Sequence, residues 1–409
     1  MSRVVITGAG IVSPIGIGRN IFWSNLTGGV SGVRATECLS YPGLAGPIQA
    51  AMVEADLSAL LPCRQSVWNG TRTTSFALAA ARLALDDAGL DLTTLNLKTV
   101  GIAFGTTLSC LSLMSRYDRQ AIEEGPRLAN PGVFPDTGFS APSCRLSVLL
   151  GPCAFNVTLS NGETSVLDAI EYACTFIRAG RAEMVLVGGS EELSPESMFG
   201  FANSRRAKAK ATTDGQENPR RNARKSPAYG EGAAVVVLES MEHAQRRSCR
   251  VLSEILSSSS TCEPLRIMDP RLGVHHGRLA VQNALNKAQV QPQQIDFVCC
   301  GANSSRGSDA VEARVLDGIF GARKPLRTAP KVVLGDSYSA GGAMQVVTAS
   351  LALHTGVVPP TASKDPGQLR RGFTDSGQAS QPQIGLVTSF ATTGANAALV
   401  LKSADVAGC

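Results

Sequence analysis

The turn around Glu163 offers the clearest setting for chemistry in this sequence. It follows a strand that we predict over residues 155–160 and precedes a helix that we predict to end near Arg178. The N-terminus of a helix lowers the pKa of a thiol and stabilises negative charge, so it suits a nucleophile. This chain has an acidic side chain there, which the helix dipole tolerates. The sequence therefore places a carboxyl group, and no thiol, at the head of this helix.

Cysteines and histidines are the other groups that could do chemistry. None of the eleven cysteines lies in a CxxC pair or at a spacing from a histidine that would suggest zinc. The sequence as a whole implies no metal and no dissociable cofactor. Cys153 precedes the strand and Cys174 lies in the middle of the helix, where no helix terminus activates a thiol. We predict structural roles for all four histidines, with His243 and His354 in helices and His275 and His276 in a loop.

Alternating strands and helices must position this turn. A strand over residues 3–8 ends in a glycine turn, a helix follows over 73–89, and the next strand covers 99–104. After the helix that ends near Arg178, a strand at 184–187 is closed by Gly188 and Gly189. The alternation favours an α/β fold with covered sheets. Later elements are predicted as strands at 251–256, 296–300, 332–334, 384–388 and 397–401, and helices at 279–288, 310–320 and 340–354.

Composition limits the class of protein. The chain has 409 residues, of which 44% are apolar and 17% charged, as expected for about two globular domains with a large core. We place these domains at 1–250 and 251–409. The sequence contains no run of eighteen apolar residues, so no membrane span is predicted. The N-terminus lacks the layout of a signal peptide, and we expect a cytoplasmic protein.

The net charge of +5 is unevenly distributed along the chain. An insertion at 204–226 carries eight basic and two acidic residues. This insertion is either a solvated loop or a landing patch for an acidic partner. No aromatic residues interleave with these charges, which disfavours a nucleic-acid partner.

Several motifs together resemble those of the β-ketoacyl synthases, which are thiolase-like condensing enzymes. The motifs are GAGIVSPIG at 8–16, FW at 22–23, LTGG at 26–29, GGSEEL at 188–193 and GEGA at 230–233. The resemblance extends from Arg3 to Leu401. It implies an α/β, thiolase-like fold in which two similar halves form five layers, αβαβα. The sequence shows no repeat between the halves, so the duplication is inferred from element order and from the resemblance.

The resemblance also implies a cysteine and two histidines, and this chain lacks all three. In the family the cysteine takes the acyl chain, and two neutral imidazoles stabilise the enolate that forms when a malonyl unit loses carbon dioxide. Counting from the neighbouring motifs puts the three positions at Glu163, Gly301 and Asp336. The supporting residues of the family are retained as Lys331, Asp309 and Glu312.

These replacements oppose the family's chemistry. A carboxylate at 163 would form an anhydride with an acyl thioester, and an anionic Asp336 would destabilise an enolate. The resemblance therefore implies a chain length factor (KS-beta), the inactive subunit of a type II polyketide synthase. Such a subunit forms a heterodimer with an active ketosynthase and shapes the tunnel for an acyl chain that an acyl carrier protein delivers.

The resemblance assigns roles to three further groups of residues. The strand that pairs across the pseudo-twofold axis comprises Phe155, Asn156, Val157, Thr158, Leu159 and Ser160. If the segment 105–117 is helical, Ser109, Ser112 and Arg116 share one face of the tunnel wall. The full set of tunnel residues is Leu108, Ser109, Ser112, Leu113, Arg116 and, in place of the family's gating Phe, Thr392. The carrier-protein patch comprises Arg205, Arg206, Arg220 and Arg221.

Three alternatives stay open at this point. An initiation decarboxylase would keep the fold and have Gln at 163, but it would still need the two imidazoles. A self-sufficient β-ketoacyl-ACP synthase would need an unorthodox site, and a pure scaffold would have no tunnel. The residues leave open whether the chain is an enzyme and whether the product is an aromatic polyketide or a polyene. Glu163 and the missing gating Phe favour a polyene-type system.

Overall fold

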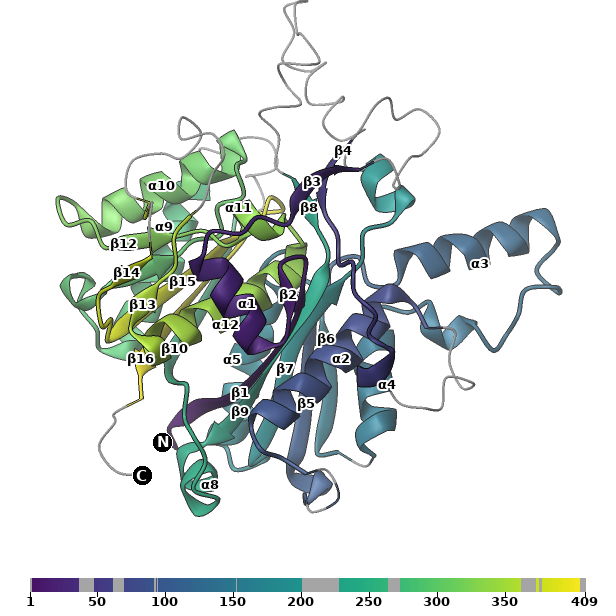
Figure 1. Ribbon diagram of the computed structural model, residues 1–409, viewed down its shortest axis with the longest axis horizontal. Coiled ribbons are helices and arrows are strands. Elements are labelled where there is room, and N and C mark those ends of the chain that lie inside the picture. Colours follow the sequence, from purple (N-terminus) through teal and green to yellow (C-terminus); the bar gives the residue numbers. More distant parts are fainter. Residues whose placement is uncertain are drawn as a thin grey trace, which may run out of the picture.

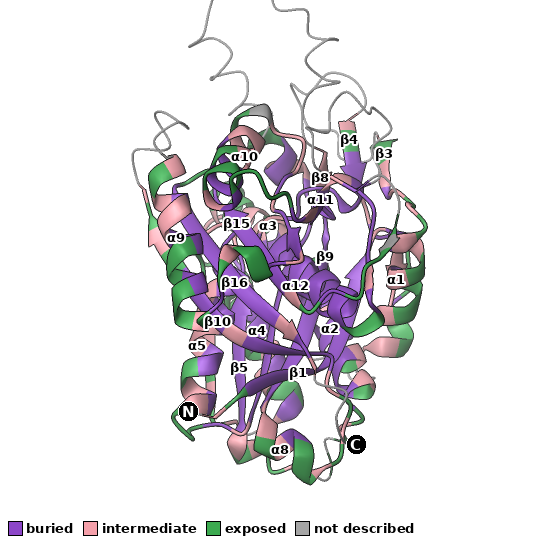
Figure 2. Cartoon of the chain, turned by 90° about the vertical axis from the view of Figure 1, so that its left-hand side faces the viewer, coloured by how far each residue is buried: buried purple, intermediate pink, exposed green. Residues whose placement is uncertain are grey.

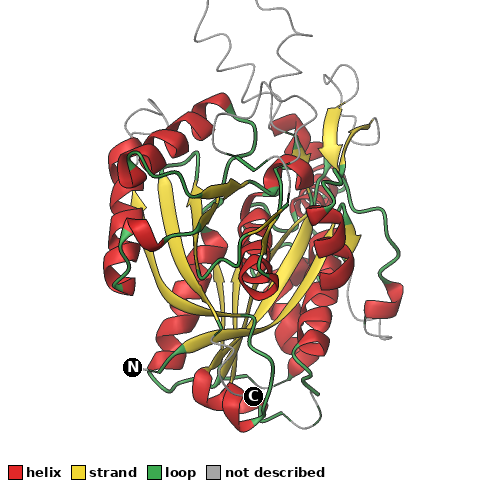
Figure 3. Ribbon diagram, turned by 60° about the vertical axis from the view of Figure 1, so that its left-hand side comes forward, coloured by secondary structure: helices red, strands yellow, loops and turns green. Residues whose placement is uncertain are grey.

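Two groups of five strands face each other across a pair of buried helices in the computed structural model of the protein (Figures 1 and 3). The structure describes residues 2–36, 48–61, 70–91, 93, 95–151, 153–200, 228–263, 273–361, 373–374 and 377–404. The first group, in spatial order, is β6 (Phe155–Leu159), β5 (Val100–Gly105), β7 (Met184–Glu191), β9 (Gly232–Ser240) and β1 (Val4–Ser13). The second is β12 (Leu326–Thr328), β11 (Phe297–Cys299), β15 (Ile384–Phe390), β16 (Ala395–Ser403) and β10 (Ser253–Cys262).

The two groups share one pattern of pairing. In each, the second strand pairs in parallel with both its neighbours, and the remaining pairs are antiparallel. The groups join where β1 and β10 pair over Val4–Ile6 and Ser253–Ile255. The similarity of the halves, which the sequence does not show as a repeat, is thus plain in the topology.

Helices form three layers around these strands. α5 (Ser165–Arg178) and α12 (Tyr338–Thr355) lie between the two groups and contact strands of both. Every residue of α12 from Ser339 to Leu353 is buried, as expected for a helix with sheet on two sides (Figure 2). The outer layers are α2 (Arg72–Asp87) and α4 (Ala141–Leu150) on one side, and α9 (Gly273–Ala288) and α10 (Arg306–Phe320) on the other. The predicted thiolase-like αβαβα arrangement is confirmed.

The remaining elements lie at the edges of this core. α3 (Leu111–Glu123) extends away from the body (Figure 1). The short elements are β2 (Gly16–Ile17), α1 (Arg19–Thr27), β3 (Val33–Thr36), β4 (Ile48–Ala51), β8 (Tyr229–Gly230), α8 (Met241–Arg246), α11 (Lys331–Leu334), β13 (Val357–Val358) and β14 (Gln378–Ala379). None of the described helices is long and apolar enough to cross a membrane.

The sequence predicted that glycines end two of the strands, and this prediction is wrong. β1 continues through Gly8 and Gly10, and β7 continues through Gly188 and Gly189 to Glu191. None of the four has a positive φ. Their role is close packing, because a Cβ at Gly10 would lie 2.0 Å from the carbonyl oxygen of a residue in α2.

The predicted strand at 332–334 is also wrong. These residues belong to α11, a single helical turn bounded by Pro330 in the αR region and Gly335 at φ +72°. The turn is buried, and Val333 and Leu334 pack into the central core. A short buried apolar run has the same pattern in a helix and in a strand, and only its surroundings decide between them.

Substituting Gly10 should test the close packing of β1 against α2. The contacted atoms at Gly10 are main-chain atoms of α2, which cannot move independently, so we expect Gly10→Ala to destabilise the fold by about 3 kcal/mol or more. Denaturant unfolding measures this. Gly307→Ala is the control, because a Cβ there meets nothing within 4 Å. Equal stability of the two variants would contradict the packing argument.

Candidate functional site

The Glu163 turn packs against the loop that follows β15. Gly162, at φ +65°, turns the chain ahead of α5, and the Ser389 hydroxyl donates to the Glu163 carbonyl oxygen at 2.9 Å. The Glu163 carboxyl group is buried. Its Oε1 accepts from the Thr392 N–H at 3.4 Å and from the Thr392 hydroxyl at 3.5 Å. The tertiary structure thus brings together the predicted nucleophile and gate positions.

Two glycines allow α5 to begin at this place. Val166, in the first turn of α5, lies over Gly105 of β5 and Gly189 of β7, where an added Cβ would come within 2.7 Å and 2.6 Å of its Cγ2. Any side chain at either position would push the helix outward. The glycine of the GGSEEL motif therefore serves to seat the helix that carries the Glu163 turn.

Asp336 lies in a buried polar cluster with Lys331. Lys331 Nζ is 3.1 Å from Asp336 Oδ1, and both side chains are buried. Asn303 donates through Nδ2 to Asp336 Oδ2 at 2.5 Å, and the Tyr338 N–H donates to Oδ1 at 3.2 Å. Both oxygens of Asp336 are therefore paired within the chain.

The Gly301 position is braced by the retained acidic residues. Glu312 Oε1 accepts from the Gly301 N–H at 2.9 Å and from the Thr388 hydroxyl at 2.6 Å. Asp309 accepts from the Asn303 N–H at 3.2 Å. A Cβ at Gly301 would lie 3.0 Å from the Thr388 carbonyl oxygen, so a histidine there would require β15 to shift. Asp309 and Glu312 now support the loop rather than an imidazole.

The charges of this cluster are interdependent. Burial and the nearby Asp336 raise the pKa of Glu163, while Lys331 opposes the shift. Burial disfavours the charge on Lys331, yet Asp336 and Glu163 outweigh it and raise its pKa. One buried cation therefore faces two acidic groups. The side chains of this cluster include no thiol and no imidazole; Asp336 pairs with Lys331 and Asn303, and Glu163 contacts Thr392.

Neither cysteine beside the turn can replace the nucleophile. Cys174 is buried inside α5, and burial raises the pKa of its thiol to about 12. Cys153 lies before β6, as expected from the sequence. At neutral pH the Cys174 thiol is protonated, and only a thiolate attacks an acyl thioester.

The histidines have structural partners or lie in helices. His243 Nδ1 lies 2.5 Å from Glu239 Oε2, and His276 Nε2 lies 3.2 Å from Glu263 Oε2. His354 is in α12 as predicted. His275 and His276 were expected in a loop, but they lie in the first turn of α9, which begins six residues earlier than the apolar pattern indicates. Among the described residues, no cluster of three or more acidic, cysteine or histidine residues could hold a metal.

The expected tunnel face is not a single helix face. Ser109 precedes α3 with φ +51°, and its buried side chain lies 3.3 Å from the Phe139 carbonyl oxygen. The Ser112 hydroxyl donates to Glu192. Leu113 is buried within the body, while Arg116 is exposed. The assumption that the helix already includes residue 109 was wrong, because α3 begins at Leu111.

β6 forms one end of the sheet order, as the pairing prediction requires of an interface strand. Its residues alternate: Phe155, Val157 and Leu159 pack toward the central core, whereas Asn156 and Thr158 hydrogen-bond to Ser143 of α4. Ser160 follows the strand. Six exposed large apolar side chains lie in the part of the sequence that runs from the end of α3 to β6, namely Ile122, Leu128, Phe134, Phe139, Val148 and Leu149. The predicted carrier-protein patch at Arg205, Arg206, Arg220 and Arg221 lies outside the described residues.

Two carboxyl groups at the end of β7 escaped the sequence analysis as functional residues. Glu191 and Glu192 are both buried and bind the segment 106–112. The available signal was a pair of acidic residues directly after an apolar strand, a position in which charge needs partners. The sequence analysis used this pair only as part of a motif.

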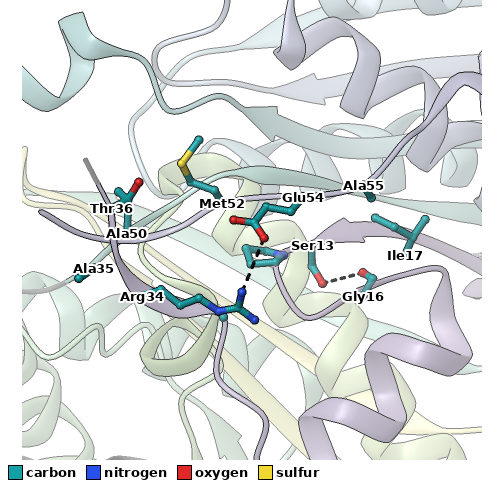
Figure 4. A pocket seen from close by; sticks show the side chains of 12 residues that line it. Ser13, Gly16, Ile17, Arg34, Ala35, Thr36, Ala50, Met52, Glu54 and Ala55 are labelled. Atoms are coloured by element: carbon teal, nitrogen blue, oxygen red, sulfur yellow. Dashed lines mark hydrogen bonds and ion pairs between the residues drawn. The ribbon is translucent and has the colours of Figure 1, made fainter. Parts of the chain in front are cut away.

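A separate pocket of 240 Å³ lies beside the turn between β1 and β2 and is lined by residues of β3 and β4 (Figure 4). Its charged residues, Arg34 and Glu54, form an ion pair at 3.6 Å. The Ser13 hydroxyl donates to the Gly16 carbonyl oxygen. The charges of the pocket are therefore paired with each other, and the Ser13 hydroxyl is occupied. None of Glu163, Gly301 and Asp336 lines it.

Replacing Glu163 by Gln should change how stability depends on pH. Because the folded chain holds the Glu163 proton more tightly than the unfolded chain does, this group favours folding at low pH, and that contribution is lost as pH rises through the folded pKa. We expect Glu163→Gln to gain stability relative to the wild type between about pH 5 and about pH 8. Denaturant unfolding across this range measures it. The exposed Glu124→Gln is the control, and an unchanged pH slope in Glu163→Gln would show that Lys331 keeps the carboxyl ionised.

Known proteins are similar to this chain over most of its length. Residues 1–244 match the N-terminal domain of beta-ketoacyl synthases, and residues 252–365 match their C-terminal domain. A 3-oxoacyl-[acyl-carrier-protein] synthase 2 of Vibrio harveyi is 27% identical over 98% of each chain. A putative polyketide beta-ketoacyl synthase 1 of Streptomyces cyaneus is 32% identical over 88% of each chain.

Solved structures of this family have the same fold as this chain. The structure titled "The ishigamide ketosynthase/chain length factor" is similar with a TM-score of 0.83 at 26% identity, over 99% of this chain and 100% of that one. A beta-ketoacyl synthase from Burkholderia phymatum has the same fold, with a TM-score of 0.83 at 21% identity, over 99% and 100% of the two chains. Since both domains of the family match in order and the fold is shared over nearly the whole length, the chain belongs to the beta-ketoacyl synthase family.

Proposed function

We propose that this chain is a non-catalytic chain length factor. It pairs with an active ketosynthase and shapes the cavity that receives the growing acyl chain during decarboxylative Claisen elongation on an acyl carrier protein. The observation that carries the proposal is the polar cluster of Glu163, Lys331, Asp336 and Asn303. At the positions that correspond to the family's reactive groups, Asp336 is buried and paired with Lys331 and Asn303, Glu163 is buried beside Thr392, and Gly301 has no side chain.

The cluster disfavours each alternative activity on chemical grounds. A self-sufficient synthase needs a thiolate, and the neighbouring Cys174 is held protonated. A decarboxylase needs hydrogen-bond donors toward a developing enolate. Of the groups present, Asp336 already accepts from Asn303 and forms an ion pair with Lys331, so it adds an acidic group where the enolate would form.

The surface beside β6 supports a partner chain. Among the described strands, β6 pairs with β5 alone, so its outer edge is open to a second strand. The exposed apolar side chains between Ile122 and Leu149 lie in the stretch that connects α3 to this edge. A chain with exposed apolar side chains and an open sheet edge is expected to cover them with a partner of the obligate class, over an interface above about 2,000 Å² in total.

The names of the relatives support the same assignment. One similar structure is named as a ketosynthase/chain length factor, and one similar sequence is named as a 3-oxoacyl-[acyl-carrier-protein] synthase. An acyl carrier protein is therefore the expected carrier of the acyl chain. The patch at 205–225 remains a proposed contact for it, because that protein is typically acidic, and a cytoplasmic location remains a prediction.

We assign the tunnel wall to Leu108 in the first place. Its side chain is partly exposed, while its N–H is held by Glu191 Oε2 at 3.1 Å. Ser109 and Ser112 are less suitable probes, because one has a strained backbone and the other donates its hydroxyl to Glu192. Thr392, exposed beside Glu163, is the proposed substitute for the gate.

Co-expression with a cysteine-containing ketosynthase paralogue should yield a stable 1:1 complex, whereas the chain alone should self-associate or dissolve poorly. Light scattering and native mass spectrometry measure this. Malonyl decarboxylation by the purified chain should stay at background, because the cluster lacks the required donors. A Val157→Pro variant, which blocks pairing along β6, should abolish the complex. Acylation and elongation by the isolated chain would overturn the proposal.

Leu108→Trp in the complex should shift the products to shorter chains, because the larger ring takes up room in the proposed tunnel. Mass spectrometry of the products gives the length distribution. Ile21→Trp is the control, since Ile21 is exposed on α1, away from α3 in the fold, and should leave the distribution unchanged (Figure 1). Unaltered lengths in Leu108→Trp would remove Leu108 from the wall.

A further inference from the structure

Glu191 binds the backbone of the turn that follows β5. Its carboxyl group accepts from the N–H groups of Thr107, of Leu108 at 3.1 Å and of Ser109 at 3.2 Å. It also accepts from the Ser339 hydroxyl at 2.5 Å, at the start of α12. Three successive N–H groups can point at one carboxyl group only if the chain curls around it. Ser109 has φ +51°, a conformation that costs a non-glycine residue on the order of 1 kcal/mol.

Glu192 supplies the N-cap that α3 lacks. Cys110 is the N-cap residue of α3 and makes no side-chain cap hydrogen bond. Instead Glu192 accepts from the N–H of Ser112, the second residue of the helix, at 3.2 Å and from its hydroxyl. A carboxyl group at this end also interacts favourably with the helix dipole. Glu192 accepts from the Thr73 N–H at 3.2 Å as well, which ties α3 to the start of α2.

Among the described residues, few other contacts hold the direction of α3; one is the ring of Tyr117, whose centroid lies 5.8 Å from that of Phe134. Leu113 alone among its thirteen residues is buried, in a small cluster with Cys110 and Ala141. The helix then leaves the body, and Ile122 near its end is 82% exposed (Figure 1). A groove of 470 Å³ runs along the helix, lined on its other side by Glu196. The direction of this arm is therefore decided at its first turn, where Glu191 and Glu192 bind.

We propose that Glu191 and Glu192 are positioning residues that set the direction of α3 and, through it, the fit of this chain to its ketosynthase partner and the length of the products. The inference rests on the proposed function. Ser339 extends the clamp to α12, so the arm is anchored to the same helix end that carries Tyr338 beside the Asp336 cluster. Ser109 and Ser112 act here as clamp residues.

Hydrogen exchange of the full-length chain tests the clamp without a partner. We expect Glu191→Gln to speed exchange at the amides of 107–109 about tenfold, and Glu192→Gln to do the same at Ser112, because an amide side chain cannot accept all the donors that a carboxylate does. Glu254→Gln removes another buried carboxylate, which lies on β10 and pairs with Arg3. This variant should leave exchange at these amides unchanged. Wild-type exchange rates in both clamp variants would overturn the proposal.

The complex tests the consequence for function. Glu192→Gln should weaken association with the ketosynthase about tenfold and broaden the product lengths, while Glu254→Gln should change neither. Ser112→Ala should have a smaller effect that does not add to that of Glu192→Gln, because the two share one contact. Faster exchange with unchanged affinity and product lengths would overturn the positioning role. A wild-type chain that binds no ketosynthase would overturn the proposed function itself, which the exchange experiment does not involve.

Discussion

The burial of two helices between two sheets is the constraint on which the rest of the structure depends. α12 is buried from Ser339 to Leu353, and α5 packs against both groups of strands on all but one side, so their contacts require small residues at close approaches. A Cβ at Gly342 of α12, for example, would lie 3.3 Å from the Glu163 carbonyl oxygen. This packing brings the N-termini of both helices to one place. The Glu163 turn begins α5, and the Asp336 loop leads into α12, so residues far apart in sequence form one cluster.

In this chain the convergence brings Glu163, Lys331 and Asp336 together. Lys331 lies 3.1 Å from Asp336, and removing either of these two would leave the other buried without its charged partner, whereas removing Glu163 would leave their ion pair in place. Asn303 hydrogen-bonds to Asp336, and Glu312 braces the loop at Gly301. The cluster is therefore part of the structural support at the centre of the fold.

α3 and the edge strand β6 form a second part of the structure with a role of its own. β7 ends at Glu191, and Glu191 and Glu192 bind the turn at 106–112 and so connect the core to α3. β6 and α4 offer an open edge and apolar side chains beside it. A rigid inner cluster and a directed outer arm are features suited to a subunit that acts on a neighbour's cavity.

The sequence alone indicated the family and the order of most elements, because motif spacing and the period of apolar residues are local properties. It also marked Glu163, Gly301 and Asp336 by counting from nearby motifs. The tertiary structure decided which segments, far apart in the sequence, contact one another. Gly8, Gly10 and Gly189 look like turn residues in the sequence, and only the fold shows that α2 lies against the first two and α5 against the third. The apolar run at 332–334 is helical because of its surroundings, and α3 starts at Leu111 because Glu192, from another element, caps it. Hydrogen bonds between distant segments leave no periodic trace in a sequence, and for that reason the pairing of Lys331 with Asp336 and the clamp on α3 became visible only in the folded chain.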